Sequence, residues 1–153
     1  MLYTASYFEP QHHHGLKIAI SRTVPRGFKV DGSLLFLAPN SDLLNDWKAQ
    51  KIDEAGYIQQ YREQTKGNWG EVKAWLDKLN AKQRLTLLCC CETAGSFCHR
   101  ALIAKLVKKY RPDCFGGCDV LRFVLPRCQN CSTELIPGLD ASFCPVCRIY
   151  SRN

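Results

Sequence analysis

Short apolar runs alternate with longer amphipathic segments over most of this chain. Runs rich in β-branched, aromatic and aliphatic side chains predict five strands, at residues 2–8, 17–21, 33–37, 84–90 and 119–125. The run at 84–90 is almost continuously apolar, which is typical of a strand buried on both faces. The pattern therefore predicts a sheet with the 84–90 strand in its interior.

Helical periodicity fills the intervals between these runs. Residues suited to cap a helix precede three periodic segments, at Asn40 or Ser41, at Asp53, and at Asn68 with Glu71 three residues later. A fourth helix is predicted over residues 97–110, with an apolar face formed by Leu102, Ile103, Leu106, Val107 and Tyr110. Strands that alternate with helices in this order predict an α/β domain at residues 1–126, with a mostly parallel sheet flanked by helices.

Length and composition exclude several classes of protein. The chain has 153 residues, of which 46% are hydrophobic and 23% charged, as in globular domains and unlike disordered chains. No apolar run approaches the roughly 20 residues that cross a bilayer, and residues 1–4 lack the basic and apolar regions of a signal peptide. We therefore expect a cytoplasmic protein without a membrane partner, in which the ten cysteines are reduced, metal-bound or catalytic.

Positive charge is concentrated in the second half of the chain. The formal net charge is +7, and residues 81–153 carry eleven Lys and Arg against five Asp and Glu. A basic surface attracts anionic partners such as nucleic acid, nucleotides or phosphate, although such a surface also serves solubility alone. Nucleic acid or a nucleotide is the partner that we expect.

Four cysteines near the C-terminus have the spacing of a metal site. Cys128 and Cys131 form one Cys-x-x-Cys pair, and Cys144 and Cys147 form a second pair after twelve residues. Two such pairs complete the tetrahedral thiolate shell that Zn²⁺ prefers, whereas iron in the same shell is less favoured. We predict a zinc ribbon at residues 127–153 with one structural zinc ion, because four thiolates leave no open position for a substrate. Such ribbons bind nucleic acid or a protein partner, or only stabilise the chain.

A second group of chemically active residues surrounds the end of the 84–90 strand. Cys90, Cys91 and Glu92 follow this strand, and Cys98, His99 and Arg100 open the next predicted helix. Ligands of parallel α/β sheets gather at this edge, and a helix N-terminus attracts anions. We expect the helix dipole, His99 and Arg100 to lower the pKa of Cys98. The sequence leaves open whether Cys90, Cys91 and Cys98 are chemical or structural.

Two arrangements of Arg100 are consistent with this pattern. In the first, which we favour, its guanidinium is at least partly exposed in a pocket and binds an anion. In the second, Arg100 pairs with Glu92 as a buried structural bridge. The pocket would also include four residues at predicted strand ends, namely Ser6, Tyr7, Ser21 and Arg22.

These residues support three classes of function. The leading hypothesis is a nucleic-acid- or nucleotide-directed protein that acts on an N-glycosidic or phosphate-bearing substrate. Glu92 would then serve as a general base or stabilise an oxocarbenium ion, and His99 would support acid–base transfer. A second hypothesis is a thiol-based enzyme or redox sensor that uses Cys98. A third is a non-catalytic adaptor module, so that whether the protein is an enzyme stays open.

Two smaller groups of residues have simpler interpretations. The three histidines at 12–14 lie in a segment flanked by Gln and Gly, which favours an exposed turn over a metal site. Cys114 and Cys118 are spaced as Cys-x3-Cys, and reduced buried thiols are the preferred interpretation.

The Cys, Glu and Cys-His-Arg residues also resemble the signature of a known family. Residues 88–92 and 98–100, with five residues between and Ala-Leu-Ile-Ala after them, resemble the pattern of the domain of unknown function 488 family. The match places the family's cysteine at Cys90 and its carboxylate at Glu92. The resemblance covers residues 2–110 and departs where three consecutive cysteines stand at 89–91 and where the ribbon is added. It implies an α/β domain with a polar pocket but supplies no activity.

Overall fold

The protein divides into two compact units, residues 1–121 and 122–153. The structure is a computed structural model that describes residues 1–91, 97–118, 130–131, 136–137, 141–143, 146–148 and 150–152. The predicted domain boundary at residue 126 and the predicted strand at 119–125 lie outside the described residues. No helix in the described part of the chain is long and apolar enough to cross a membrane.

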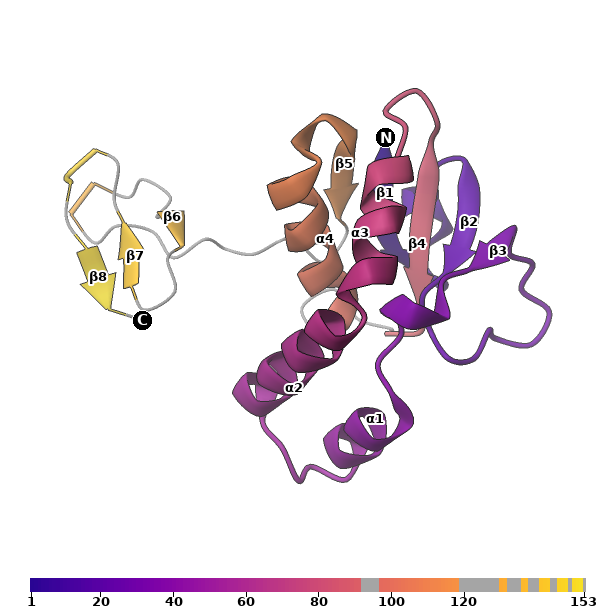
Figure 1. The fold of residues 1–153 in the computed structure, drawn as a ribbon, viewed down its shortest axis with the longest axis horizontal. Coiled ribbons are helices and arrows are strands. Elements are labelled where there is room, and N and C mark those ends of the chain that lie inside the picture. Colours follow the sequence, from indigo (N-terminus) through magenta and orange to yellow (C-terminus); the bar gives the residue numbers. More distant parts are fainter. Residues whose placement is uncertain are drawn as a thin grey trace. The chain divides into compact units, whose positions relative to one another are not determined.

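The first unit is built on a five-stranded, entirely parallel sheet with the order β3-β2-β4-β1-β5 (Figure 1). Its strands are β1 (Leu2–Ser6), β2 (Leu16–Ala19), β3 (Gly32–Ser33), β4 (Leu85–Cys89) and β5 (Phe115–Cys118). β4 lies between β1 and β2, in register from Leu2 opposite Leu85 to Ser6 opposite Cys89. The predicted parallel α/β fold is therefore confirmed.

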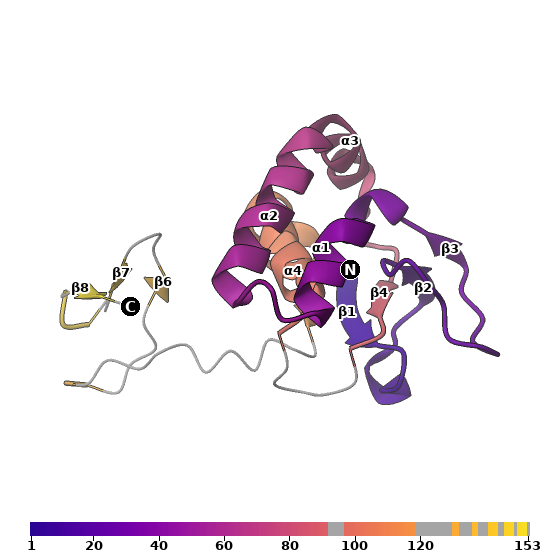
Figure 2. The same cartoon turned by 90° about the horizontal axis from the view of Figure 1, so that it is seen from below.

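The four helices of this unit pack on one face of the sheet (Figures 1 and 2). They are α1 (Ser41–Lys48), α2 (Glu54–Gly67), α3 (Trp69–Lys78) and α4 (His99–Tyr110). Leu87 and Cys89 of β4 belong to the core beneath the helices, whereas Leu88 packs on the other face against Tyr7 with Phe28 nearby. β4 is buried on both faces as predicted, but a loop rather than a helix covers its second face.

Two of the three predicted helix caps form. The side-chain oxygen of Asn40 accepts from the Leu43 amide at 2.8 Å, and that of Asp53 accepts from the Gly56 amide at 2.8 Å. The predicted cap at Asn68 is wrong, because its side chain makes no capping hydrogen bond to α3. Asn68 also ends α2 with φ −98° and ψ 18°, so it lacks the extended backbone that a capping residue needs.

Two further predictions need correction. The predicted strand at 33–37 ends at Ser33, and Leu35–Leu37 form a 3₁₀ helix that leads from the sheet edge to α1. In α4, Tyr110 is 47% exposed, and Leu102 and Leu106 are only half-buried. Ile103 and Val107 are buried as predicted. The rest of the buried stripe lies on the neighbouring side of the helix, at His99, Arg100, Ala101 and Ala104.

The second unit contains a small antiparallel sheet. Its strands are β6 (Ile136–Pro137), β7 (Ala141–Phe143) and β8 (Tyr150–Arg152), in that order. Cys131 and Cys147 are partly buried in turns of this unit. Arg148, which follows Cys147, has a positive φ of 57°, a conformation that non-glycine residues adopt mainly in tight turns.

Candidate thiol and imidazole cleft

A cleft of about 360 Å³ lies in the first unit, at the carboxyl ends of β2 and β4. Three kinds of side chain line it: the thiols of Cys89, Cys90, Cys91 and Cys98, the rings of Trp47, Tyr57 and Phe97, and polar groups that include Ser21, Arg22, Lys48 and His99. Parallel α/β sheets bind ligands at this edge, because helix N-termini and strand ends meet there. The cleft is therefore the candidate functional site.

Three soft donor atoms meet at the floor of this cleft. The Nδ1 atom of His99 lies 3.8 Å from the Sγ of Cys89 and 3.8 Å from the Sγ of Cys98. All three donor atoms lie within 4.8 Å of one another, and the three residues are at most 5% exposed. Cys91 adds a third thiol, 3.8 Å from the Sγ of Cys89. Soft thiolates and imidazole are ligands for Zn²⁺ and related ions, so this donor set is able to hold a metal.

A hydrogen bond fixes which nitrogen of His99 faces the thiols. The Nε2 atom lies 2.9 Å from the carbonyl oxygen of Ile20. A carbonyl only accepts hydrogen bonds, so Nε2 carries the proton and donates it. Burial lowers the pKa of His99, which keeps the ring neutral. The Nδ1 lone pair is therefore directed at Cys89 and Cys98.

The charge on the thiols does not lie where the sequence predicts. The pKa of Cys98 is raised well above its usual value, first by hydrogen bonding to Cys89 and Cys91 and then by burial. The pKa of Cys89 is lowered, because Cys91 and Cys98 donate hydrogen bonds to its thiolate. The predicted lowering of the Cys98 pKa is therefore wrong, and the thiolate form is favoured at Cys89 over Cys98.

Arg100 also departs from its favoured arrangement. Its side chain is fully buried at 0% exposure, so the predicted exposed guanidinium is wrong. Its Nη1 atom donates to the Cys91 carbonyl at 3.3 Å and to the Cys98 Sγ at 3.6 Å. The first turn of α4 faces the sheet, and this turns Arg100 inward. Glu92, the alternative partner of Arg100 and the predicted general base, lies outside the described residues.

Only two of the four predicted pocket residues from strand ends line the cleft. Ser21 and Arg22 do so, whereas Ser6 and Tyr7 are 0% and 2% exposed and absent from its lining. The Ser6 hydroxyl accepts from the Phe8 amide at 3.2 Å. Ser21 donates to the Thr23 carbonyl, so the Tyr7 hydroxyl donates to Ser21 at 3.0 Å. Tyr7 therefore positions Ser21, and the prediction that Ser6 and Tyr7 contact a ligand directly is wrong.

The remaining candidates divide between described and undescribed parts of the chain. Cys128 and Cys144 lie outside the described residues, so the ribbon ligands stay a prediction. His12 is exposed, and the Nε2 of half-buried His13 donates to the Ser6 carbonyl at 2.7 Å. Cys114 is buried and Cys118 is partly buried.

Cys89 is the residue that the sequence analysis missed. It was obscured because the family signature places the functional cysteine at the next position, Cys90. Successive side chains of a strand point to opposite faces, so Cys89 joins Leu87 on the helix side and Cys90 packs on the other side. Strict alternation along β4 was a signal that Cys89 and Cys90 lie on opposite faces, so that only one of them could meet His99.

The fold and the cleft together define a class: a parallel α/β domain with a site of cysteine and histidine side chains at the carboxyl edge of its sheet. A family model described as the active DUF488-N3 subclade matches residues 2–111. The chain therefore belongs to the domain of unknown function 488 family, which confirms the resemblance seen in its sequence. No curated protein and no solved structure matches the chain.

Proposed function

We propose that the cleft binds a nucleotide or a nucleotide unit of a nucleic acid. The observation that carries this proposal is the presence of aromatic rings and cationic side chains in one cleft. Aromatic faces stack on bases with little sequence preference, and cations bind phosphate. A site built only for metal or for thiol chemistry needs neither group.

The aromatic part of the cleft is a compact cluster. The ring centroids of Trp47 and Tyr57 lie 5.3 Å apart, and that of Phe97 lies 5.6 Å from Trp47 and 5.1 Å from Tyr57. The three rings meet edge to face, at interplanar angles between 62° and 78°. Mutual packing fixes their orientation, so they offer a base a preformed apolar wall.

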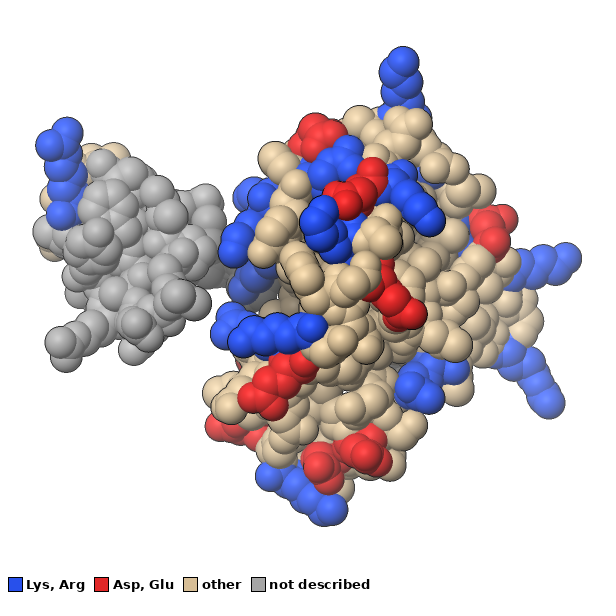
Figure 3. Space-filling view, in the orientation of Figure 1, with Lys and Arg blue, Asp and Glu red and all other residues tan. Residues whose placement is uncertain are grey.

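The cations for this proposal are Arg22 and Lys48. Arg22 and Lys48 are both exposed, and both line the cleft. They take over the anion-binding role first assigned to Arg100. Elsewhere on the unit, the face shown in Figure 3 carries Lys and Arg interspersed with Asp and Glu. Phosphate recognition is assigned to these two cations of the cleft.

An enzymatic version of this function acts on an N-glycosidic or phosphate-bearing bond. His99 presents an unprotonated Nδ1 to the cleft floor, where it accepts a proton. Glu92, as general base or oxocarbenium-stabilising carboxylate, stays a prediction from the sequence.

The experiment is calorimetric titration of the full chain with nucleoside monophosphates, the matching nucleosides and inorganic phosphate. The monophosphates should bind most tightly, with Arg22→Gln and Lys48→Gln each weakening them about tenfold, or about 1.4 kcal/mol. Lys82→Gln, which removes an exposed cation from the loop before β4, is the matched control and should have no effect. Absence of nucleotide binding, or an equal loss in the control, would overturn the proposal.

We also propose that Cys128, Cys131, Cys144 and Cys147 bind one structural zinc ion and help the second unit to dock a larger anionic partner. The turns that hold Cys131 and Cys147 next to an antiparallel sheet support this assignment. Cys144→Ser should release one zinc ion per chain and leave the unfolding of the first unit unchanged. Retention of that ion would contradict the ribbon.

One observation favours a second function, thiol-based catalysis or redox sensing. The lowered pKa of Cys89 enriches its thiolate, which is the nucleophilic form. In this alternative Cys89 replaces Cys98 as the reactive residue, and Cys91 is the adjacent thiol.

A further inference from the structure

We propose that Cys89, Cys98 and His99 bind a single soft divalent cation of the zinc class at the floor of the cleft. This site is separate from the four cysteines of the predicted ribbon. It also stands independently of nucleotide binding, which is proposed to rest on the aromatic rings and on Arg22 and Lys48. A metal on His99 Nδ1 would replace the proton-accepting role of that atom in the enzymatic version. The chain would then carry two metal sites, one in each unit.

The separations of the donor atoms fit a tetrahedral ion. Bonds of about 2.3 Å to sulphur and about 2.0 Å to nitrogen place a sulphur and a nitrogen ligand about 3.5 Å apart, and two sulphurs about 3.8 Å apart. His99 Nδ1 lies 3.8 Å from each of the two sulphurs, and no pair in the set exceeds 4.8 Å. Side-chain movements of less than one ångström therefore bring all three donors to bonding distance.

The surroundings of His99 are those of a metal ligand. A histidine that binds a metal through one nitrogen usually donates the other N–H to a carboxylate or a backbone carbonyl, which orients the ring. In His99 the Nε2 proton goes to the Ile20 carbonyl at 2.9 Å, and the Nδ1 lone pair is left for the thiols. A buried histidine that served packing alone would not need its lone pair aimed between two sulphurs.

The three donors are held by rigid elements. Cys89 is the last residue of β4 and lies opposite Ser6 in the parallel register. Cys98 precedes the first turn of α4, and His99 is its first residue. The partial positive charge of a helix N-terminus favours the thiolates that bind a cation. Ligands on a strand end and a helix start are positioned before the ion arrives, which lowers the entropic cost of binding.

The fourth position of the tetrahedron faces the cleft. Cys91 lies on this side, half-buried and 3.8 Å from the Cys89 sulphur. The three consecutive cysteines at 89–91 are also where the chain departs from the family signature. The additional thiols beside the family's Cys90 thus acquire a specific role in metal binding.

The experiment uses the full chain with its ribbon disabled by Cys131→Ser and Cys147→Ser. This variant is titrated under reducing conditions with Co²⁺, which occupies tetrahedral zinc sites and absorbs visible light. We expect one equivalent of Co²⁺ to bind, with intense tetrahedral bands and sulphur-to-metal charge transfer. Adding Cys98→Ser or His99→Gln should weaken binding at least tenfold, whereas Cys114→Ser, a buried cysteine beyond the C-terminal end of α4, should not.

Two results would overturn the proposal: no Co²⁺ binding by the ribbon-disabled chain, or unchanged binding after Cys98→Ser. A measurement without substitutions in the cluster covers the case in which these variants do not fold. X-ray absorption of the zinc-loaded, ribbon-disabled chain should show both sulphur and nitrogen ligands. A shell of oxygen alone would also overturn the site. None of these outcomes depends on nucleotide binding.

Discussion

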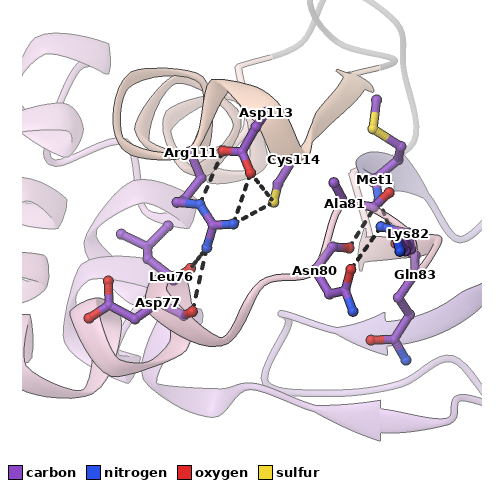
Figure 4. A network of polar contacts seen from close by, with 10 residues as sticks. All are labelled: Met1, Leu76, Asp77, Asn80, Ala81, Lys82, Gln83, Arg111, Asp113 and Cys114. Carbon is purple, nitrogen blue, oxygen red and sulfur yellow. Dashed lines mark hydrogen bonds and ion pairs between the residues drawn. The ribbon is translucent and has the colours of Figure 1, made fainter.

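The two ends of α4 carry the same residue types in different arrangements. Beyond its C-terminal end, Arg111 holds Asp113 through two hydrogen bonds of 3.1 and 2.9 Å and donates to the Cys114 sulphur at 3.0 Å (Figure 4). Arg111 also donates to the Leu76 carbonyl at 2.7 Å. The pKa of Cys114 is raised by burial and by its hydrogen bond to Asp113. The Asp113 carboxylate thus accepts the hydrogen bonds of the Arg111 guanidinium, and the raised pKa keeps the Cys114 thiol protonated.

At the N-terminal end, the described partners of Arg100 are a thiol and a carbonyl. The thiols there hydrogen-bond to one another and face the lone pair of His99. Hydrogen bonds from Cys91 and Cys98 lower the pKa of Cys89 within this group. The comparison shows that an arginine beside a cysteine is not itself a functional feature. The N-terminal end differs in having several thiols and an imidazole in mutual contact, whereas the C-terminal end has a single thiol beside a carboxylate.

The largest expected effect concerns the two arginines themselves. Arg100→Gln removes a fully buried guanidinium and leaves its partners without their donor, which should cost about 3–5 kcal/mol of unfolding free energy. Arg22→Gln, the same change at the exposed cleft rim, should cost less than about 0.5 kcal/mol. The loss of unfolding free energy in Arg111→Gln should lie between those of the other two variants. Urea denaturation of the three variants measures their unfolding free energies and therefore this order of stability.

Equal stability of Arg100→Gln and Arg22→Gln would contradict the buried role of Arg100. A second variant sharpens the result, since Glu92→Gln on top of Arg100→Gln tests the predicted bridge. Recovery of stability in the double variant would identify Glu92 as the partner of Arg100.

The sequence predicts the secondary structure and the fold better than the geometry of the site, because local residue patterns determine the former and tertiary packing determines the latter. The caps at Asn40 and Asp53 depend only on residues three positions away, so local pattern suffices. The cap at Asn68 fails because the same residue ends the preceding helix, which the local pattern does not include. The predicted inner face of α4 is confirmed at Ile103 and Val107 but wrong at Tyr110 for a related reason, because the sheet selects the stripe that it buries.

The site residues required knowledge of which strand face meets α4. The alternation of side chains along β4 places Cys89 and Cys90 on opposite faces of the sheet. Only the packing of α4 on one of these faces decides which cysteine meets His99. The positive charge of Arg100 favours an exposed side chain, but in the structure the side chain is buried beside the thiols of the cleft. Trp47 and Tyr57 pack in the hydrophobic core, and only the folded chain shows that they also line the cleft.

An intermediate effect is expected in the reactivity of the thiols. Cys91 is half-buried and lines the cleft, whereas Cys98 and Cys114 are 2% and 1% exposed. In metal-free protein, iodoacetamide should modify Cys91 at least about tenfold faster than Cys98 or Cys114, because the pKa of all three thiols is raised and only Cys91 is accessible to the reagent. Peptide mass spectrometry at successive times measures the rate at which each cysteine is modified. Modification of Cys98 first would restore it as the reactive thiol.

The smallest effect tests the C-terminal end of α4 through its acid dependence. Hydrogen bonds from Arg111 lower the pKa of Asp113 to about 2, below its value in an unfolded chain of about 4. A depressed folded-state pKa adds stability that is fully present above about pH 4 and lost as the pH falls through about 2. The stability difference between the native chain and Asp113→Asn should therefore be constant above pH 5 and shrink toward pH 2. Arg111→Gln removes the cause, so adding Asp113→Asn to it should change the pH profile little. A difference that stays constant down to pH 2 would show that the Arg111–Asp113 pair is not formed in solution.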